Sequence, residues 1–322
     1  MDISISDSHA RLRNVLEAPF FSPVRPYLMW REALAEDRFV KKIANSWGVE
    51  TFDFDRMKGK LTGKGQKVFY VLGSGSSIEE LSPENFDTIS REVSAGINAW
   101  ALHDFIPNIY AFEPVPERDS DHYSTMQLLE REDVVRRRPT IMFLKPRNPI
   151  EVEQLRMVPA ALQSDTLLYG RFQPYTREIK NLAGDLNMVW NLASRKLSVL
   201  PDSGASIVRM AFLGLLLGFS KIVFVGVDLN HTEYFWEKNP GYLEKFGRSA
   251  FSSGQKKSTH ETLTTDNRAF SVVDMVVALH KVARQRGVSV EVVSSRSLLA
   301  DYLPLHEFPP PGAALPNQEV TN

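Results

Sequence analysis

Short apolar runs alternate with helix-like segments along most of the chain. The strand-like runs are Val68–Leu72, Val93–Ile97, Asn108–Phe112, Thr140–Leu144, Leu197–Leu200, Ile222–Val227 and Val288–Val293. Apolar residues at helical spacing predict helices at Thr125–Glu132, Ser206–Leu217 and Ser271–Gln285. Strands and helices in alternation are typical of a mostly parallel sheet with helices on both faces. We therefore predict an α/β fold.

Three segments fall outside this alternation. Residues 1–65 carry apolar residues at mixed helical spacing, which predicts an N-terminal helical appendage to a main domain at residues 66–308. Within that domain, residues 229–266 are rich in Tyr, Ser, Lys and Gly without clear periodicity, which is typical of a functional lid. Residues 309–322 lack packing residues and predict a flexible tail.

The first convincing strand is followed by a small-residue turn, Gly73-Ser74-Gly75-Ser76-Ser77, and then by a helix-like segment. Unpaired backbone amides at a helix start form an anion site, so the turn predicts contact with a nucleotide phosphate. Ile78 and Glu79 stand where a P-loop has its lysine and hydroxyl residue, and the third glycine of a dinucleotide fingerprint is absent. Binding of ATP by a P-loop and ordinary binding of NAD are therefore disfavoured.

Polar residues also follow the other predicted strands, at the edge where parallel sheets bind ligands. They are Asn98, Glu113, Asp202-Ser203-Gly204 and Asp228–Asn230. Two of these positions have a purely structural alternative. Asp202 or Ser203 is a suitable N-cap for the helix that follows, and Asp228 is suited to fixing the turn after its strand.

Composition narrows the class of protein. The 322 residues are 43% hydrophobic and 24% charged, as in ordinary globular proteins, and the formal net charge of -1 disfavours a nucleic-acid partner. The basic run Arg136-Arg137-Arg138 is interpreted as a solvated face. Because the chain has no cysteine, disulfides, thiolate zinc sites and cysteine nucleophiles are excluded.

The same features bear on location. The absence of cysteine fits a reducing compartment, and the first residues show no apolar core of signal-peptide length. The longest apolar run, Ala211–Phe219, is too short to span a bilayer. We expect a cytoplasmic protein that is at most peripherally bound to a membrane.

Two stretches carry a family resemblance. They are SGASIVRMAFLGLLLGFSKIVFVGVDLN, residues 203–230, and SRSLLADYL, residues 295–303. With the first turn, their order and spacing resemble the bacterial sialyltransferases of the Campylobacter lipooligosaccharide type. The resemblance covers Val68 to Leu303 and implies a single Rossmann-like glycosyltransferase domain with a lid. The same outline also occurs in proteins of the pterin pyrophosphokinase type.

Carried over to this chain, the resemblance implies a site for cytidine monophosphate (CMP). Its residues are Gly73, Ser74, Gly75, Ser76, Asn98, Glu113, Ser203, Gly204, Asp228 and Asn230. Three of them depart from the family pattern. Ser74 stands where the family usually has asparagine, Glu113 stands near another asparagine, and Asn230 replaces a tyrosine. A carboxylate at position 113 would repel a phosphate unless it binds a hydroxyl group.

The chemistry implied is inverting displacement at the anomeric carbon of a sugar. His260 is the expected base, with His231 as a competitor, and Tyr234 and Tyr242 are the expected hydrogen-bond donors to the leaving phosphate. No metal and no separate cofactor are expected, because a monophosphate leaving group needs less charge neutralisation. Asp53-Phe54-Asp55 resembles a metal-binding Asp-x-Asp pattern but precedes the first strand, so we interpret it as a surface pattern.

The sequence therefore predicts transfer of sialic acid or a related acidic sugar from a CMP-activated donor to a bacterial surface glycan precursor. The resemblance also implies a homo-oligomer and weak attachment to the inner membrane face. A pterin pyrophosphokinase-like enzyme is the first alternative, with Glu113, Asp202 and Asp228 as candidate magnesium ligands. The second is a sugar-nucleotide-binding protein without catalytic activity.

Overall fold

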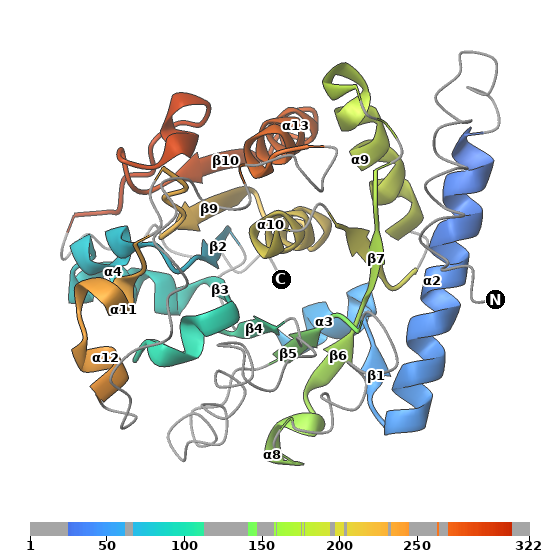
Figure 1. Cartoon of the computed structure of the whole chain (residues 1–322), viewed down its shortest axis with the longest axis horizontal. Coiled ribbons are helices and arrows are strands. Elements are labelled where there is room, and N and C mark those ends of the chain that lie inside the picture. The colour runs from blue at the N-terminus through green and yellow to red at the C-terminus, as the bar shows by residue number, and fades with distance from the viewer. Residues whose placement is uncertain are drawn as a thin grey trace, which may run out of the picture.

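The computed structural model describes most of the chain between residues 25 and 310 (Figure 1). The described residues are 25–61, 67–112, 141–146, 158, 160–174, 176, 178–193, 197–202, 205–230, 233–244, 263 and 270–310. The predicted helix Thr125–Glu132 and the basic run at residues 136–138 lie outside them.

Eight parallel strands form the main sheet, in the order β1-β6-β5-β4-β3-β2-β9-β10. They are β1 (Glu50–Thr51), β2 (Val68–Leu72), β3 (Val93–Ile97), β4 (Ile109–Phe112), β5 (Ile141–Leu144), β6 (Thr166–Leu168), β9 (Lys221–Val225) and β10 (Ser289–Val292). A second parallel pair consists of β7 (Gly170–Phe172) and β8 (Val199–Pro201). The predicted α/β class with a mostly parallel sheet is confirmed.

Helices cover both faces of the sheet (Figure 1). The α-helices are α2 (Arg25–Trp47), α3 (Phe54–Lys60), α4 (Pro83–Arg91), α8 (Ala160–Gln163), α9 (Ile179–Ala193), α10 (Ser206–Leu216), α11 (Phe235–Lys238), α12 (Gly241–Glu244) and α13 (Val272–Arg284). Three 3-10 helices are η2 (Ser76–Glu80), η3 (Asn98–Leu102) and η5 (Leu298–Asp301). No described helix combines the length and the apolar character that crossing a membrane requires.

Side chains of successive residues in a strand pack on opposite faces of the sheet. In β2, Phe69 and Val71 join the buried cluster of α9, α10 and α13, whereas Tyr70 and Leu72 join the cluster of α4, η3 and α11. Both faces are therefore apolar, which explains why these strands are continuous hydrophobic runs in the sequence.

The direction of the chain across the sheet reverses at β2. From β2 the chain moves outward through β3, β4, β5 and β6, and it later returns to the other side of β2 with β9 and β10. In open α/β sheets, ligands bind outside the carboxyl ends of the strands at such a switch point. Here that place lies between the ends of β2 and β9, which pair from Val68↔Lys221 to Leu72↔Val225.

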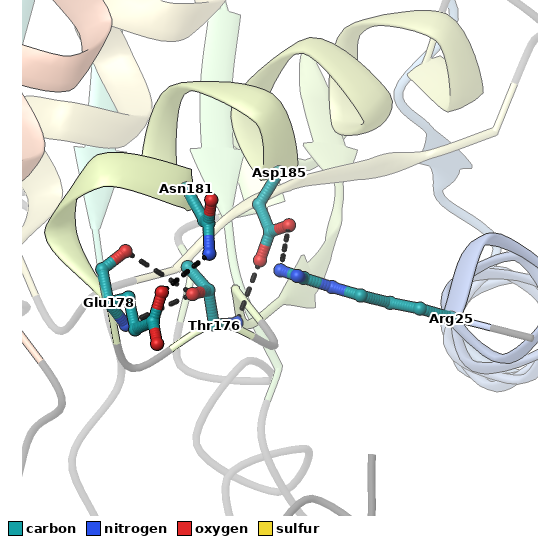
Figure 2. A network of polar contacts seen from close by, with 5 residues as sticks. All are labelled: Arg25, Thr176, Glu178, Asn181 and Asp185. Carbon is teal, nitrogen blue, oxygen red and sulfur yellow. Dashed lines mark hydrogen bonds and ion pairs between the residues drawn. The ribbon is translucent and has the colours of Figure 1, made fainter. Parts of the chain in front are cut away.

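The N-terminal residues that are described pack into the same core. β1 pairs with β6 at the edge of the sheet, and Met29 and Ala33 of α2 are fully buried. Figure 2 shows the polar contacts that hold the start of α2 to α9: Arg25 reaches Asp185, and the Thr176 amide donates to the Asp185 carboxylate at 2.9 Å. The appendage at residues 1–65 and the other domain bounds stay predictions.

Candidate functional site

Two strand ends meet at the switch point. The Gly73 amide donates to the Val225 carbonyl at 2.7 Å, and the Gly75 amide donates to the Gly226 carbonyl at 2.8 Å. A Cβ on Gly73 would lie 2.5 Å from the Gly226 oxygen, and one on Gly75 would lie 2.9 Å from it. Glycine is needed in the first turn because the two turns pack directly against each other.

The backbone amides of the first turn have partners within the protein. The Ser76 amide donates to the Glu233 carbonyl at 3.2 Å, the Ser77 amide donates to Asp228 at 3.0 Å, and the Ile78 amide donates to Gly75 at 3.2 Å. These three amides, which the sequence analysis expected to be unpaired, therefore already have hydrogen-bond acceptors within the protein. A nucleotide at this turn would have to use other groups, and the contact of Gly73, Ser74, Gly75 and Ser76 with a nucleotide stays a prediction.

Asp228 fixes the turn after β2. One carboxylate oxygen accepts from the Ser77 amide and the other from the Ser77 hydroxyl, and Asp228 is 3% exposed. These contacts are structural, but they reach the segment after β2 and not the turn after β9 that the structural alternative named. Ser77 is the second residue of η2, so the end of β9 holds the start of the segment after β2.

Residues 295–303, the second stretch that carries the family resemblance, also pack on the end of β9. The Ser297 hydroxyl donates to the Val227 carbonyl, and the Leu298 amide donates to the Asp228 carbonyl at 2.9 Å. Asn230 is exposed, and its side-chain amide donates to the Arg296 carbonyl. The fold thus brings together the three stretches that carry the sequence resemblance.

Tyr234 lies beside the first turn, as expected of a residue that contacts a ligand there. It forms an antiparallel bridge with Gly75, and its ring stacks on Trp236 with centroids 4.5 Å apart. The next amide, that of Phe235, donates to the Ser74 carbonyl at 3.1 Å. A predicted phosphate donor and the predicted phosphate turn are therefore neighbours.

Tyr242 contacts the other side of η2. Its ring stacks on His103 with centroids 5.3 Å apart. Burial, followed by the charge and hydrogen bond of Glu79, raises the pKa of the Tyr242 hydroxyl, which therefore keeps its proton at neutral pH. The Asn239 side chain donates to the same Glu79 carboxylate at 3.2 Å. Glu79 thus holds the α11–α12 segment to η2.

Part of the predicted lid is therefore packed structure. Residues 233–244 are described, and Phe235 and Leu243 are buried there. Asn98 is the first residue of η3, directly after β3. The remaining predicted site residues, Glu113, Ser203, Gly204, His231 and His260, lie outside the described residues.

The structure also contains a buried ion cluster that the sequence analysis missed. Lys145 Nζ lies 3.0 Å from Asp202 Oδ2, and Arg209 contacts the other Asp202 oxygen. Burial and the charge of Arg209 lower the pKa of Lys145 to about 7, although Asp202 opposes this shift. The sequence feature that could have revealed this cluster is a lysine directly after the apolar run Ile141–Leu144.

This cluster corrects one expectation. The N-cap of α10 is Ala205, which makes no side-chain capping bond, so the proposal that Asp202 caps this helix is wrong. Asp202 is bound by two cations instead, because its carboxylate lies beside Lys145 and Arg209.

Two of the three candidate magnesium ligands of the pterin pyrophosphokinase-like alternative, Asp202 and Asp228, are among the described residues. Within the described ranges, no three His, Asp or Glu side chains are grouped so as to hold a metal ion. Asp202 binds two cations, Asp228 binds Ser77, and Glu113 lies outside the described residues. Asp53 accepts a hydrogen bond from the Arg56 amide at 3.0 Å and caps α3.

An open hollow of about 530 Å³ lies at the β1 edge of the sheet, at the far side from the β2–β9 junction. Its lining comes from α2, β1 and the start of α3 and includes Lys41, Asn45, Glu50, Asp53 and Arg56. Arg56 and Glu50 form an ion pair across this surface. Of the predicted nucleotide-binding residues that the structure describes, none lines this hollow.

Comparison with known proteins finds distant structural likeness. No protein-family model matches the chain, and no curated protein matches it either. The sialyltransferase CstII from Campylobacter jejuni, in complex with the substrate analogue CMP-3FNeuAc, is 15% identical with a TM-score of 0.44, over 75% of this chain and 86% of that one.

Two further structures show likeness of the same order. The monofunctional alpha-2,3-sialyltransferase Cst-I from Campylobacter jejuni is 16% identical with a TM-score of 0.43, over 76% of this chain and 82% of that one. The MAf glycosyltransferase from Magnetospirillum magneticum AMB-1 is 17% identical with a TM-score of 0.38, over 79% of this chain and 38% of that one.

Proposed function

We propose that this protein is an inverting, metal-independent glycosyltransferase that moves sialic acid or a related acidic sugar from a CMP-activated donor to a glycan acceptor. The proposal starts from the sequence resemblance, which is strongest at residues 203–230 and 297–302.

One structural observation carries the proposal. The turn after β2, the end of β9 and the Ser297 segment meet at the switch point of a parallel sheet. These are the stretches that carry the resemblance, and this is where α/β sheets bind ligands. The geometry thus supports a nucleotide at the carboxyl ends of β2 and β9.

The reaction needs a base and a stabilised leaving group. The acceptor oxygen forms a bond to the anomeric carbon while the bond from that carbon to the phosphate oxygen breaks, and its electron pair stays on the nucleotide. His260 accepts the acceptor's proton, with His231 as the competing base. Tyr234 donates to the phosphate, and Tyr242, whose hydroxyl donates to Glu79 in the structure, has to exchange that partner for the phosphate. The contact between Tyr234 and the Gly75 turn supports its role.

We further propose a cytoplasmic protein, peripherally bound to the inner membrane face, that acts on a precursor of a bacterial surface glycan as a homo-oligomer. The homo-oligomer and the membrane attachment rest on the sequence resemblance, and the cytoplasmic location rests on the cysteine-free composition.

The test is a thermal-shift panel with CMP, CMP-sialic acid and ATP, each with and without magnesium. We expect stabilisation by both cytidine ligands without metal. Stabilisation by ATP only in the presence of magnesium would contradict the proposal and favour the diphosphate-transfer alternative. Binding of the donor without its hydrolysis or transfer would favour a binding protein. Donor hydrolysis by a His260→Ala variant then tests the base, and unchanged turnover would remove His260 from the mechanism.

A further inference from the structure

Helix α2 lies at the outer edge of the molecule, and its outer side is basic (Figure 1). Met29 and Ala33 are fully buried on its inner side. The side chains of Arg31, Arg38 and Lys42 are exposed. Their spacing of seven and four residues places them on one stripe of the helix. We refer to these three residues as the basic stripe.

The acids of α2 do not neutralise the basic stripe. Asp37 is buried, and Glu32 and Glu36 are partly buried, so none of the three is among the exposed residues of the helix. Asp37 is held by Lys41 at 2.7 Å and by the Ser198 amide at 2.8 Å. Among the described residues, the members of the basic stripe form no ion pair. The outer face of α2 therefore presents uncompensated positive charge to the solvent.

Two aromatic rings lie at the amino end of this face. Tyr27 is 55% exposed and Trp30 is 40% exposed, and their ring centroids are 6.3 Å apart. Exposed apolar side chains are common on soluble proteins when they stand singly. Tryptophan and tyrosine beside cations, however, are the combination that proteins use at the interface between a membrane and water.

The shape and charge of this face favour a bilayer over other anionic partners. From residue 31 to residue 42 the basic stripe extends about 16 Å along the helix axis, which suits an array of negative charges better than a single phosphate. A symmetric contact between two copies of the chain would bring like charges together. The formal net charge of -1 disfavours a nucleic acid.

We propose that the outer face of α2, made of the basic stripe with Tyr27 and Trp30, binds the anionic lipid surface of a membrane. The cations are attracted to the lipid phosphates, and the two rings enter the headgroup layer. This inference deepens the proposed function, on whose membrane attachment it rests, because it assigns the surface that makes the contact. Because α2 packs on β1, β6 and β7, away from the β2–β9 junction, substitutions on its outer face leave the candidate site unchanged.

Co-flotation of the full-length protein with lipid vesicles tests this surface. The protein should bind vesicles of phosphatidylcholine and phosphatidylglycerol in equal parts but not vesicles of phosphatidylcholine alone, and its affinity should fall as salt rises. A triple variant, Arg31→Gln, Arg38→Gln and Lys42→Gln combined, should lose about a hundredfold in affinity, because each cation near an anionic surface contributes about fivefold. Its remaining binding should depend less on salt.

The matched control changes the same residue types on other helices. Arg91 of α4 and Lys281 and Arg284 of α13 are exposed, and their combined replacement by glutamine changes the net charge by the same amount. This control should bind the anionic vesicles as wild type does. Trp30→Gln should weaken binding without altering its salt dependence, because the ring carries no charge.

Equal vesicle affinity in the triple variant and its control would overturn the inference, as would failure of wild type to bind the anionic vesicles. Duplex DNA bound as tightly as the vesicles would also overturn it, in favour of a surface for polyanions in general. A changed sedimentation coefficient in the triple variant alone would instead assign the face to a contact between copies. Thermal unfolding checks that each variant is folded.

The outcome is separable from that of the proposed reaction. Vesicle binding by a protein that does not bind CMP would support the membrane surface, although the proposed transfer would fail. Stabilisation by CMP without vesicle binding would overturn the membrane surface and leave the proposed transfer standing.

Discussion

At the scale of single residues, the close contact of two turns places the strictest demand on the sequence. Gly75 lies against the Gly226 carbonyl and the Asp228 carboxylate, so there is no room for a side chain. Glycine is required here because the backbone of the turn after β2 packs directly against the backbone of the turn after β9.

Gly75→Ala should destabilise the protein by about 1–3 kcal/mol, because its methyl group must displace Asp228 or the backbone of Gly226. Chemical denaturation measures the change. The control is Gly184→Ala in the exposed middle of α9, where a Cβ meets nothing within 4 Å. It should be neutral or stabilising by about 0.5–1 kcal/mol. Equal stabilities of the two variants would contradict this account of the turn.

The pair Ser77–Asp228 should behave as one unit. Asp228→Asn replaces one acceptor by a donor that faces a Ser77 donor, so about 1–3 kcal/mol of stability should be lost. Ser77→Ala removes only the hydroxyl. In a double-mutant cycle, the combined loss should be smaller than the sum of the single losses. Additive losses would show that the two side chains do not depend on each other.

The two tyrosines at the candidate site should differ in their effects. Removing one donor to a developing negative charge typically lowers kcat by about 10²–10³-fold, and we expect this of Tyr234→Phe. Tyr242→Phe should have the smaller effect, because the hydroxyl of Tyr242 already has Glu79 as a partner. Single-turnover transfer from CMP-sialic acid measures both. A larger loss in Tyr242→Phe would reverse these assignments.

At the scale of elements, the junction of α2 and α9 shows how a distant helix is attached. Asp185 is 3% exposed and accepts from Arg25 and from the Thr176 amide (Figure 2). Truncating Arg25 would leave a buried carboxylate with one charged partner fewer.

Arg25→Ala should therefore cost more stability than removal of an exposed cation. Lys180, whose side chain is 77% exposed and pairs with Glu178 just before α9, is the matched control. We expect Lys180→Ala to change stability by about 0–1 kcal/mol and Arg25→Ala by clearly more. Hydrogen exchange should show the difference in the first turns of α2. Equal effects would mean that α2 is held by its apolar face alone.

At the scale of the whole molecule, Lys145 links stability to pH. In the unfolded chain its pKa is the ordinary value of 10.5, while in the folded protein it is about 7. Between these values the unfolded chain holds a proton that the folded protein has released, so this group makes the protein more stable as pH rises. Below pH 7 the cost of burying the charge is present in full.

The difference in unfolding free energy between wild type and Lys145→Met should accordingly change in favour of wild type from about pH 7 to about pH 10. Denaturation curves at several pH values measure it, and comparison with the variant cancels the other titrating groups. Parallel curves for the two proteins would show that Lys145 does not titrate in this range.

β2 and β3 were predictable because they are buried on both faces and therefore form apolar runs, and their bounds match the predicted ones. β1, β6 and β7, with two or three residues each, were not predicted, whereas the equally short β8 was found because it overlaps the longer apolar run Leu197–Leu200. The helix at Ile179–Ala193 was not predicted at all. At the site, the sequence placed the polar strand ends at one edge of a parallel sheet, but it predicted no strand order, and the pairing of β2 with β9 is known from the structure.

The contacts that give individual residues their roles did not follow from local sequence. Asp202 pairs with Lys145, and Tyr242 forms a hydrogen bond with Glu79, although each pair is far apart in the sequence. Only the assembled sheet brings such residues together, so the sequence offered Asp202 or Ser203 as an N-cap alternative and Tyr242 as a phosphate donor, without showing the partners of Asp202 and Tyr242.

The strand order also has a consequence for synthesis on the ribosome. β2 is made early, yet one of its two neighbours, β9, is made only after β3 to β8, and β1 likewise waits for β6. Until then the growing chain exposes unpaired edges of apolar strands, which are prone to aggregation. A chain truncated before β9 would lack one wall of the candidate site and leave β2 exposed at the edge of the sheet. The candidate site can therefore be completed only late in the synthesis of each chain, after β9 has been made.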